Sequence, residues 1–415
     1  MRTVGRIIGV PPWGEAPTGT ASSSERPSSE RPAWEGASCE GLDGPIGDRT
    51  VLGVPLTEWQ AHAMAQAGAP LVQDSDDLDA ECIVAAPHHF YSARAVYLTL
   101  QAGRAAGRDL RCLTDAVGPR PVNALTDEAP GLVYLRPGSG ADLAVRAAAA
   151  EPITISAEER EIPGFTIGDG PLRVADAWVL PVGHWTQLLW ANLLALGPHL
   201  WSELAGRGLL GGARLGWAAL RAWSVQPEDV AARLVRRGAG ARVHRNATVE
   251  GVWMGEGARI GAGAVVRGAV LGPGAVVEEL AVVEGVVMGA GARVQRQALA
   301  KFMVIEAGAA HAGIAQLGVV GAGAQVKSGA TLMDMTLGPA VRVQVRGALR
   351  PAPHGICGVC VGPRSVIGSG VRIAPGRAVP ADLTVLPDPG TVLARVSRPA
   401  GATRAVVRNG ALEPS

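Results

Sequence analysis

The chain has 415 residues and a formal net charge of +1 at pH 7, because 38 Lys and Arg are balanced by 37 Asp and Glu. This balance offers no broad basic surface for nucleic acid and no acidic surface for a basic partner. No apolar run approaches the roughly 18 residues of a membrane span. The short apolar run before Pro11 makes a poor signal peptide. A cytoplasmic location is therefore the default expectation.

Residues 1–48 are predicted to be a flexible N-terminal segment, because the stretch 11–48 is rich in Pro, Ser, Gly and Glu. An α/β domain is predicted over residues 49–181. Within it, "VPLTEWQAHAMAQAGAP" has apolar residues at helical spacing and ends at Gly68, and "YSARAVYLTLQAGRAAG" indicates a second amphipathic helix that ends at Gly107. The segment "ECIVAAP" between them is typical of a short buried strand.

A helical connector rich in tryptophan is predicted over residues 182–236, with a break at Gly197 and Pro198. Its tryptophans are Trp185, Trp190, Trp201, Trp217 and Trp223. Packing between two domains is the favoured interpretation, because apolar helices usually contact protein. A helix on a membrane surface is the alternative.

From residue 237 the sequence repeats with a step of 17, and large apolar residues fall at intervals of six, six and five, as in Met254, Ile260, Val266 and Leu271. A period near eighteen divided in three predicts a coil with three flat sides, each a short strand whose large residue points inward. Gly, with 56 residues in the chain, accepts the tight corners. We therefore predict a parallel β-helix of about eight coils over residues 237–385, followed by a C-terminal tail over 386–415.

This repeat resembles the hexapeptide motif of the left-handed β-helix, which is found in trimeric acyltransferases and in the C-terminal domains of sugar nucleotidyltransferases. The stretch "VRGAVLGPGAVVEELAVVEGVVMGAGARV" looks most like the helix appended to hexose-1-phosphate nucleotidyltransferases. The resemblance implies left-handed winding and assembly of the chain with itself, as a homotrimer or another homo-oligomer.

The segment "GDRTVLGVPLTEWQAHAMAQAGA" resembles the part of sugar nucleotidyltransferases that follows their nucleotide-binding loop. The matching residues are Gly53, Pro55, Leu56, Ala67 and Gly68. In that family a loop ending in Gly-Thr-Arg comes just before this segment, but here Gly19 and Thr20 have no Arg after them. Where the family has a metal-binding Asp, this chain has "AAP". The domain over 49–181 is therefore expected to be a reduced nucleotidyltransferase-like domain that has lost its site.

Hexapeptide acyltransferases typically use one histidine as general base and bind acyl-CoA between neighbouring subunits, so the resemblance implies acyl-CoA as a cosubstrate. The histidines within the repeat are His244, His311 and His354, and the last two lie where the repeat is interrupted. His311 and His354 are therefore the candidate catalytic residues, with a structural role as the alternative. His244 has an ordinary outward position.

Charged residues that flank the interruptions are candidate ligand-binding residues for a phosphate or pyrophosphate, with solvated surface charges as the alternative. They are Lys327, Asp334, Arg342 and Arg364. Cys357 and Cys360 have CxxC spacing but no second pair of ligands, so no metal is expected and inward packing is favoured. The five cysteines in all give no disulfide framework.

The function predicted from these features is that of a hexapeptide-repeat transferase-like protein, which transfers an acyl group to an activated sugar or nucleotide-sugar, or binds one. Whether the protein is catalytically active is left open, because a fold does not determine a function. The alternatives are a non-catalytic β-helix scaffold and a divergent sugar-1-phosphate nucleotidyltransferase.

Overall fold

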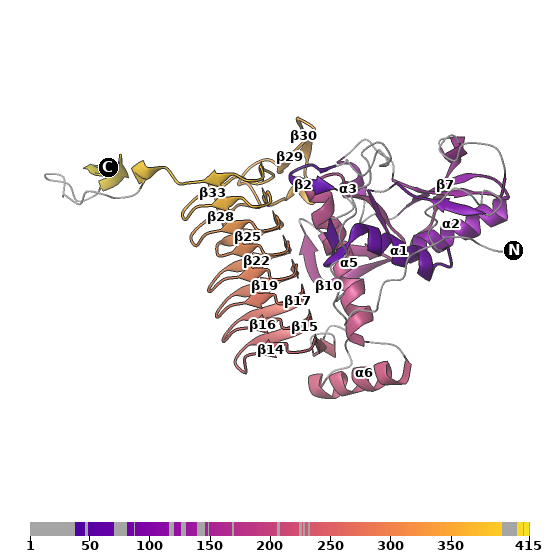
Figure 1. Ribbon diagram of the computed structural model, residues 1–415, viewed down its shortest axis with the longest axis horizontal. Helices are drawn as coiled ribbons and strands as arrows, with labels where there is room; N and C mark the ends of the chain where they lie inside the picture. Colours follow the sequence, from indigo (N-terminus) through magenta and orange to yellow (C-terminus); the bar gives the residue numbers. More distant parts are fainter. Residues whose placement is uncertain are drawn as a thin grey trace, which may run out of the picture.

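The computed structural model describes residues 38–45, 49–69, 81–86, 88–115, 120–125, 130–138, 146–147, 149–167, 170–205, 208–223, 226, 229–230, 233–391, 405–409 and 411–414. The predicted flexible segment 1–48 lies largely outside these residues, and so does part of the predicted tail 386–415. Figure 1 shows an N-terminal region of helices and short sheets beside a long stack of short strands. Among the described residues, no helix is both long enough and apolar enough to cross a bilayer.

The N-terminal region contains a mixed four-stranded sheet in the order β5 (Cys82–Val84), β8 (Leu132–Leu135), β7 (Leu110–Thr114) and β9 (Glu151–Ile155). Strands β7 and β9 are parallel, and the other two pairs are antiparallel. The segment predicted as a short buried strand does form a strand, β5, but its residues are only partly buried. That this region is a reduced nucleotidyltransferase stays a prediction.

Short two-stranded pairs complete the N-terminal region. They are β1 (Ser38–Cys39) with β2 (Leu42–Pro45), β3 (Thr50–Val51) with β4 (Val54–Pro55), β6 (His89–Tyr91) with β12 (Val179–Pro181), and β10 (Glu159–Ile167) with β11 (Gly170–Ala175). A short helix, α3 (Arg120–Asn123), contacts the helix α5 described below.

Two predicted helices are confirmed. Helix α1 (Leu56–Gln66) and helix α2 (Ala93–Ala106) share a buried core with Tyr91 and Tyr134. The side chain of Ser92 accepts a hydrogen bond from the backbone N–H of Ala95 at the start of α2. Gly107 ends this helix with a φ of 63°, a left-handed conformation that glycine adopts without strain.

The tryptophan-rich segment forms α5 (Trp185–Ala205) and α6 (Gly208–Ala222). The predicted break at Gly197 and Pro198 is wrong, because α5 continues through Pro198. A proline inside a helix removes one backbone hydrogen bond, and burial of the surrounding apolar residues offsets that loss. Trp185 and Trp190 of α5 are buried, which confirms packing between two parts of the chain for this helix.

The second part of the chain is a parallel β-solenoid of about nine turns, against the about eight expected. Its strands stack in three ladders, which we call the first, second and third faces. The first face consists of β13 (Val235–Arg237), β15 (Thr248–Met254), β17 (Val265–Leu271), β20 (Val287–Met288), β23 (Val304–Ile305), β26 (Val319–Val320), β31 (Cys360–Val361) and β34 (Ala378–Val379).

The second face consists of β14 (Arg242–Val243), β16 (Arg259–Ile260), β18 (Val276–Val277), β21 (Arg293–Val294), β24 (Ala310–His311), β27 (Gln325–Val326), β32 (Val366–Ile367) and β35 (Thr384–Val385). The third face consists of the first halves of β15 and β17, then β19 (Val282–Glu284), β22 (Leu299–Lys301), β25 (Ile314–Gln316), β28 (Thr331–Leu332) and β33 (Arg372–Ile373).

The inward residues form columns, as the spacing predicts. Met254 pairs with Leu271, Leu271 with Met288, and Met288 with Ile305, all in parallel register. These side chains and the corresponding residues of the other faces form one buried apolar cluster along the axis. The predicted three-sided stacked coil is therefore confirmed, and left-handed winding stays a prediction.

Glycine occupies the corner that follows most strands of the first face. A Cβ atom placed on Gly272 would lie 2.8 Å from the carbonyl carbon of Gly289 in the next coil. Contacts this short between Cβ and backbone force one coil away from the next. The repeated glycine of the sequence is therefore a consequence of coil stacking.

One coil is two residues shorter than its neighbours, since Ile305 and Val320 are in register but 15 positions apart, against 17 for Met288 and Ile305. The missing residues come from the corner between the second and third faces, which is closed by Gly313. A Cβ on Gly313 would lie 2.4 Å from the carbonyl oxygen of Ala330. The stack itself continues without interruption.

A segment over residues 333–359 is inserted between the third and first faces. It carries the hairpin β29 (Arg342–Val345) with β30 (Ala348–Pro351) and the short 3-10 helix η2 (Pro353–Gly355). Val343 and Val345 of this hairpin are buried in the same core as Trp185 of α5. The insertion therefore fastens the solenoid to the N-terminal region. At the other end of the chain, β36 (Ala405–Arg408) and β37 (Ala411–Pro414) form a separate hairpin.

Helix α5 covers the first face of the solenoid. The outward residues of that face are apolar, and they share one buried core with α5: Trp253, Val270, Val287, Val304 and Val319. Figure 1 shows α5 between the solenoid strands and the N-terminal sheet. One of the three faces is thus occupied by this chain's own N-terminal region, and we call this contact the junction.

Candidate functional site

His311 lies inside the solenoid. In strand β24 it is in parallel register with Val294 of the coil before and Val326 of the coil after, both of which point into the interior. The sequence predicts that the repeat is interrupted at His311. The structure differs because the shortened corner begins after His311 and leaves the strand itself regular.

The imidazole of His311 is fully buried. Its Nε2 lies 3.0 Å from the carbonyl oxygen of Leu299 and donates to it, and its Nδ1 has no hydrogen-bond partner among the described residues. Burial lowers the pKa of His311 to about 4, although the nearby carbonyls of Leu299 and Gly313 favour its charged form. A general base must reach the proton that it removes, and this position gives an acceptor no access.

His354 lies at the surface end of the junction. It belongs to η2 in the insertion, and its φ of 56° is in the left-handed region that non-glycine residues seldom adopt. The centroid of its ring is 4.9 Å from that of Trp190 on α5, with the planes tilted by 46°. The residue is partly exposed, and burial of its inner side lowers the pKa of its imidazole. His354 thus combines solvent access with a fixed orientation and a neutral ring near pH 7.

The four predicted ligand-binding residues do not converge. Arg364 follows the first face and forms a two-pronged ion pair with Asp382 of the next coil. Arg342 lies in the hairpin of the insertion and donates to the carbonyl oxygen of Leu349 at 2.8 Å. These two guanidinium groups are therefore already engaged by neighbouring groups of the chain.

Lys327 and Asp334 occupy two further places. Lys327 is exposed at the corner after β27, and its ammonium group contacts the side chain of Gln325. Asp334 begins the insertion, where its backbone carbonyl accepts a hydrogen bond from the N–H of Cys357 at 3.0 Å. Within the described residues of one chain, these four side chains form no common phosphate site.

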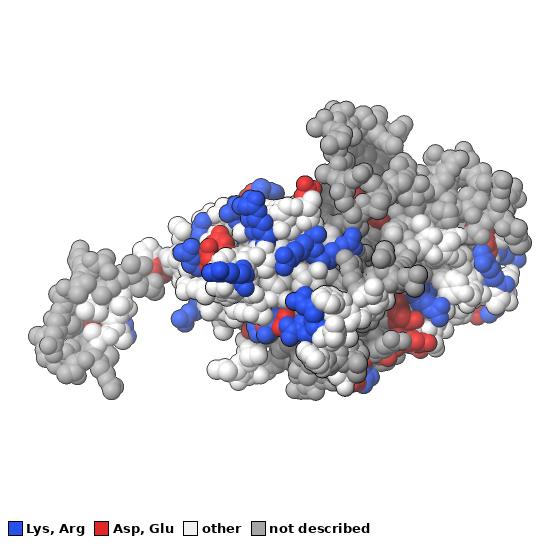
Figure 2. All heavy atoms as spheres, turned by 90° about the horizontal axis from the view of Figure 1, so that it is seen from below, with Lys and Arg blue, Asp and Glu red and all other residues white. Residues whose placement is uncertain are grey.

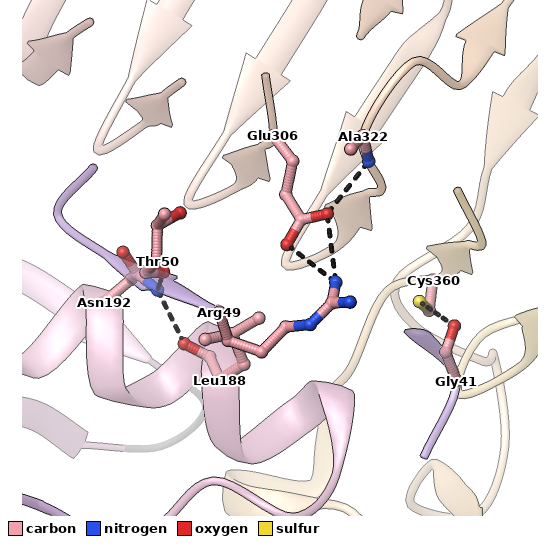
Figure 3. Close-up of polar contacts among 8 residues, drawn as sticks. All are labelled: Gly41, Arg49, Thr50, Leu188, Asn192, Glu306, Ala322 and Cys360. Atoms are coloured by element: carbon pink, nitrogen blue, oxygen red, sulfur yellow. Dashed lines mark hydrogen bonds and ion pairs between the residues drawn. The ribbon is translucent and has the colours of Figure 1, made fainter. Parts of the chain in front are cut away.

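The junction contains a buried ion pair that sequence reasoning missed. Nη1 of Arg49, just before β3, lies 3.4 Å from each carboxylate oxygen of Glu306 in the solenoid, and both side chains are buried. The carboxylate also accepts a hydrogen bond of 2.9 Å from the backbone N–H of Ala322 in the next coil. Figure 3 shows Arg49 reaching from the N-terminal segment to this carboxylate. The pair joins parts of the chain that are 257 positions apart.

The repeat itself contains a signal for Glu306. The corner position that follows the first-face strand is glycine in the neighbouring coils, as in Gly272, Gly289 and Gly321, whereas one coil has glutamate there. A carboxylate at a corner that most coils fill with glycine indicates a specific partner. The sequence could not identify that partner, because Arg49 lies in another domain.

Further polar contacts hold the junction together. Asn192 of α5 accepts a hydrogen bond of 2.7 Å from the N–H of Leu52 and donates to the carbonyl of Leu188. His184 bonds to Thr186 through Nδ1, and its Nε2 lies 3.0 Å from the carbonyl oxygen of Gln344 in the hairpin. Burial lowers the pKa of His184 to about 4. The neutral imidazole therefore connects α5 to the insertion.

The cysteines at the junction are packing residues. Sγ of Cys360 lies 3.4 Å from the carbonyl oxygen of Gly41, as Figure 3 shows. Burial raises the pKa of Cys39 to about 12 and also raises the pKa values of Cys357 and Cys360. These thiols stay protonated, so they are poor nucleophiles and poor metal ligands. The expectation that Cys357 and Cys360 face the solenoid interior is wrong, because both belong to the core shared with α5.

No group of three or more His, Cys, Asp or Glu within the described ranges is placed to hold a metal ion. In the sheet of the N-terminal region, Ala85 and Ala86 follow β5 at the place where the resemblance calls for a metal-binding Asp. The structure therefore gives no observation in favour of nucleotidyl transfer.

No protein-family model matches the chain, and no curated protein sequence matches it either. Solved structures that it resembles include a hexapeptide transferase family protein from Anaplasma phagocytophilum, with 17% identity and a TM-score of 0.22 over 37% of this chain and 75% of that one. Another is a mutant perosamine N-acetyltransferase from Caulobacter crescentus, with 14% identity and a TM-score of 0.16 over 67% and 93%. A third is the acetyltransferase domain of PglB from Neisseria gonorrhoeae, with 17% identity and a TM-score of 0.15 over 67% and 96%. At TM-scores this low, no conclusion about function follows from these likenesses.

Proposed function

We propose that the protein is a hexapeptide-repeat transferase that moves an acyl group to an activated sugar or nucleotide-sugar, with His354 as general base. The observation that carries this proposal is the position of His354. It is the histidine of the two interruptions that solvent can reach, and Trp190 fixes its ring. A base that is neutral at the working pH can take the proton of an amine or hydroxyl acceptor.

Several further predictions from the sequence belong to the same proposal. They are left-handed winding of the solenoid, assembly as a homotrimer or other homo-oligomer, a cytoplasmic location and descent of residues 49–181 from a nucleotidyltransferase. Acyl-CoA is the proposed donor. Because Lys327, Asp334, Arg342 and Arg364 do not converge in one chain, we assign none of them to the phosphates of acyl-CoA.

Binding and turnover test the proposal separately. Thermal unfolding is followed with acetyl-CoA and with nucleotide-sugars, since a ligand that binds the native state raises its apparent stability. Release of free CoA thiol is then measured for the wild type and for His354→Ala, for which we expect a loss of about 100-fold or more in kcat. His244→Ala is the matched control, because His244 is exposed on the first coil and far along the solenoid from the insertion. No thermal shift with either ligand class, or equal turnover in the two variants, would refute the assignment.

A non-catalytic scaffold is the second candidate, and the third face of the solenoid favours it. The outward residues of successive coils on that face are Val265, Val282, Leu299 and Ile314, and Ile314 is 57% exposed. An apolar column of this kind suits self-association. The variant Val282→Glu separates the two candidates when light scattering and acyl-transfer turnover are both measured. If the protein is a scaffold, the variant loses its assembly and there is no turnover to lose. If the protein is an enzyme, turnover falls together with the assembly.

A further inference from the structure

Helix α6 exposes large apolar side chains to solvent. Trp217, Leu220 and Trp223 are 63%, 57% and 92% exposed. Trp217 and Leu220 are three residues apart and so lie along one side of the helix, and Trp223 follows its last residue with a φ of 51°. On the opposite side, Leu215 and Ala218 pack into the core that α6 shares with α5. The helix is therefore apolar on two sides, and the described residues leave one of them exposed.

In the sequence, the charged residues of the stretch that contains α6 are all arginines. Arg207, Arg214 and Arg221 recur every seven positions in the sequence, and residues 204–227 contain no Asp or Glu. Trp and Leu beside arginine are the residues of helices that lie in the interface of a bilayer, where the indole ring spans the apolar and hydrated layers. Packing against protein alone does not explain why all the charged residues in this stretch are positive.

The first coil of the solenoid adds to the positive charge. Arg233, Arg237, Arg242 and Arg245 are exposed, and residues 230–249 contain no acidic residue. In Figure 1, α6 and β14 of the first coil lie at the same end of the molecule. Figure 2 shows that end directly, with Lys and Arg predominating over the solenoid. Helix α6 and the basic first coil thus lie at the same end of the molecule.

We propose that α6 and the first coil form one surface that binds an anionic lipid bilayer, with Trp217, Leu220 and Trp223 entering the headgroup region. Arginine side chains near a negatively charged membrane each add to the attraction. A second copy of the chain fits less well, since the same arginines would oppose one another across a face-to-face contact. This inference does not depend on the proposed acyl transfer.

Vesicle flotation of the full chain tests the proposal. Vesicles of phosphatidylcholine alone are compared with vesicles of phosphatidylcholine and phosphatidylglycerol. We expect about tenfold tighter binding to the anionic vesicles, a blue shift of tryptophan fluorescence on binding, and release when the salt concentration is raised.

Matched variants locate the surface. Trp217→Ser combined with Trp223→Ser, and separately Arg237→Gln combined with Arg242→Gln, are each expected to weaken binding about tenfold. Leu386→Ser and Arg372→Gln are the controls, because both residues are exposed near the other end of the solenoid. Thermal unfolding shows whether each variant keeps its fold; if the tryptophan pair does not, Leu220→Ser takes its place.

Three results would overturn the proposal. One is failure of the wild type to float with anionic vesicles at low salt. Another is full binding by both folded surface variants. The third is a wild-type dimer, or a complex with duplex DNA, that the tryptophan variant abolishes while vesicle binding is absent.

Discussion

Two neighbouring coils of the solenoid obey the same repeat but carry different residues at two equivalent positions. In the coil before Ile305, the corner residue is Gly289 and the inward residue of the second face is Val294. In the next coil the same positions hold Glu306 and His311. Gly289 and Val294 serve only coil stacking, whereas Glu306 also pairs with Arg49 of the N-terminal region and His311 lies beside a shortened corner. Departures from an internal repeat therefore mark where a coil does more than stack.

The largest effect is expected from breaking the buried ion pair between Arg49 and Glu306. Glu306→Ala leaves the buried guanidinium of Arg49 without its carboxylate, and the loss of one partner of a buried pair destabilises by about 3–5 kcal/mol. Urea unfolding measures the change. Asp382→Ala is the control, because its pair with Arg364 is exposed, and little change is expected there.

A double variant sharpens this prediction. Arg49→Met combined with Glu306→Ala removes both charges, so we expect it to be more stable than Glu306→Ala alone. If the two variants unfold at the same urea concentration, the ion pair contributes nothing beyond its packing.

Burial of His311 inside the solenoid makes the free energy of unfolding depend on pH. The pKa of His311 is about 4 in the folded chain against an ordinary 6.5, so folding favours the neutral ring. Stability is therefore complete above pH 6.5 and is lost as the pH falls from 6.5 to 4, by about 3 kcal/mol. His311→Val restores the residue type of the neighbouring coils and should remove this part of the pH dependence.

Urea unfolding of both proteins across this pH range measures the difference. His184, which has a similarly lowered pKa, titrates in both and cancels in the comparison. Parallel curves for the wild type and His311→Val would show that the interior of the coil is open to water.

These two positions also show how far the sequence could be read. The columns of Met254, Leu271 and Met288 follow from spacing alone, because coil stacking forces equivalent residues into register. His311 was misplaced because a two-residue deletion resembles a loop in the sequence, whereas Gly313 absorbs it in a tight corner. The partner of Glu306 could not be predicted, because a contact across 257 positions depends on how two domains pack. For the same reason the ring contact of His354 with Trp190 was not foreseen.

A smaller effect is expected from substituting a corner glycine in a coil that follows the regular repeat. Gly272→Ala places a Cβ atom against the backbone of the next coil, which should destabilise by about 1–3 kcal/mol. Gly338→Ala is the matched control, because nothing lies within 4 Å of the added atom and its φ is not in the left-handed range. Thermal unfolding of both variants compares them. Equal unfolding midpoints for the two variants would mean that neighbouring coils can move apart enough to accept the added Cβ atom. The glycine at this corner would then need another explanation.

The smallest effect is expected from the charges that run along the outside of the third face. Arg267 pairs with Glu250 of the coil before and with Glu284 of the coil after, and Lys301 extends the ladder by one coil. The side chain of Arg267 is 52% exposed, so Arg267→Gln should cost about 0.2–1 kcal/mol. High salt should shrink the difference from the wild type, because it screens exposed pairs, whereas the loss caused by Glu306→Ala should persist. If Arg267→Gln lowered the stability as much as Glu306→Ala does, the coils would be held in register by surface charge and not by their apolar columns.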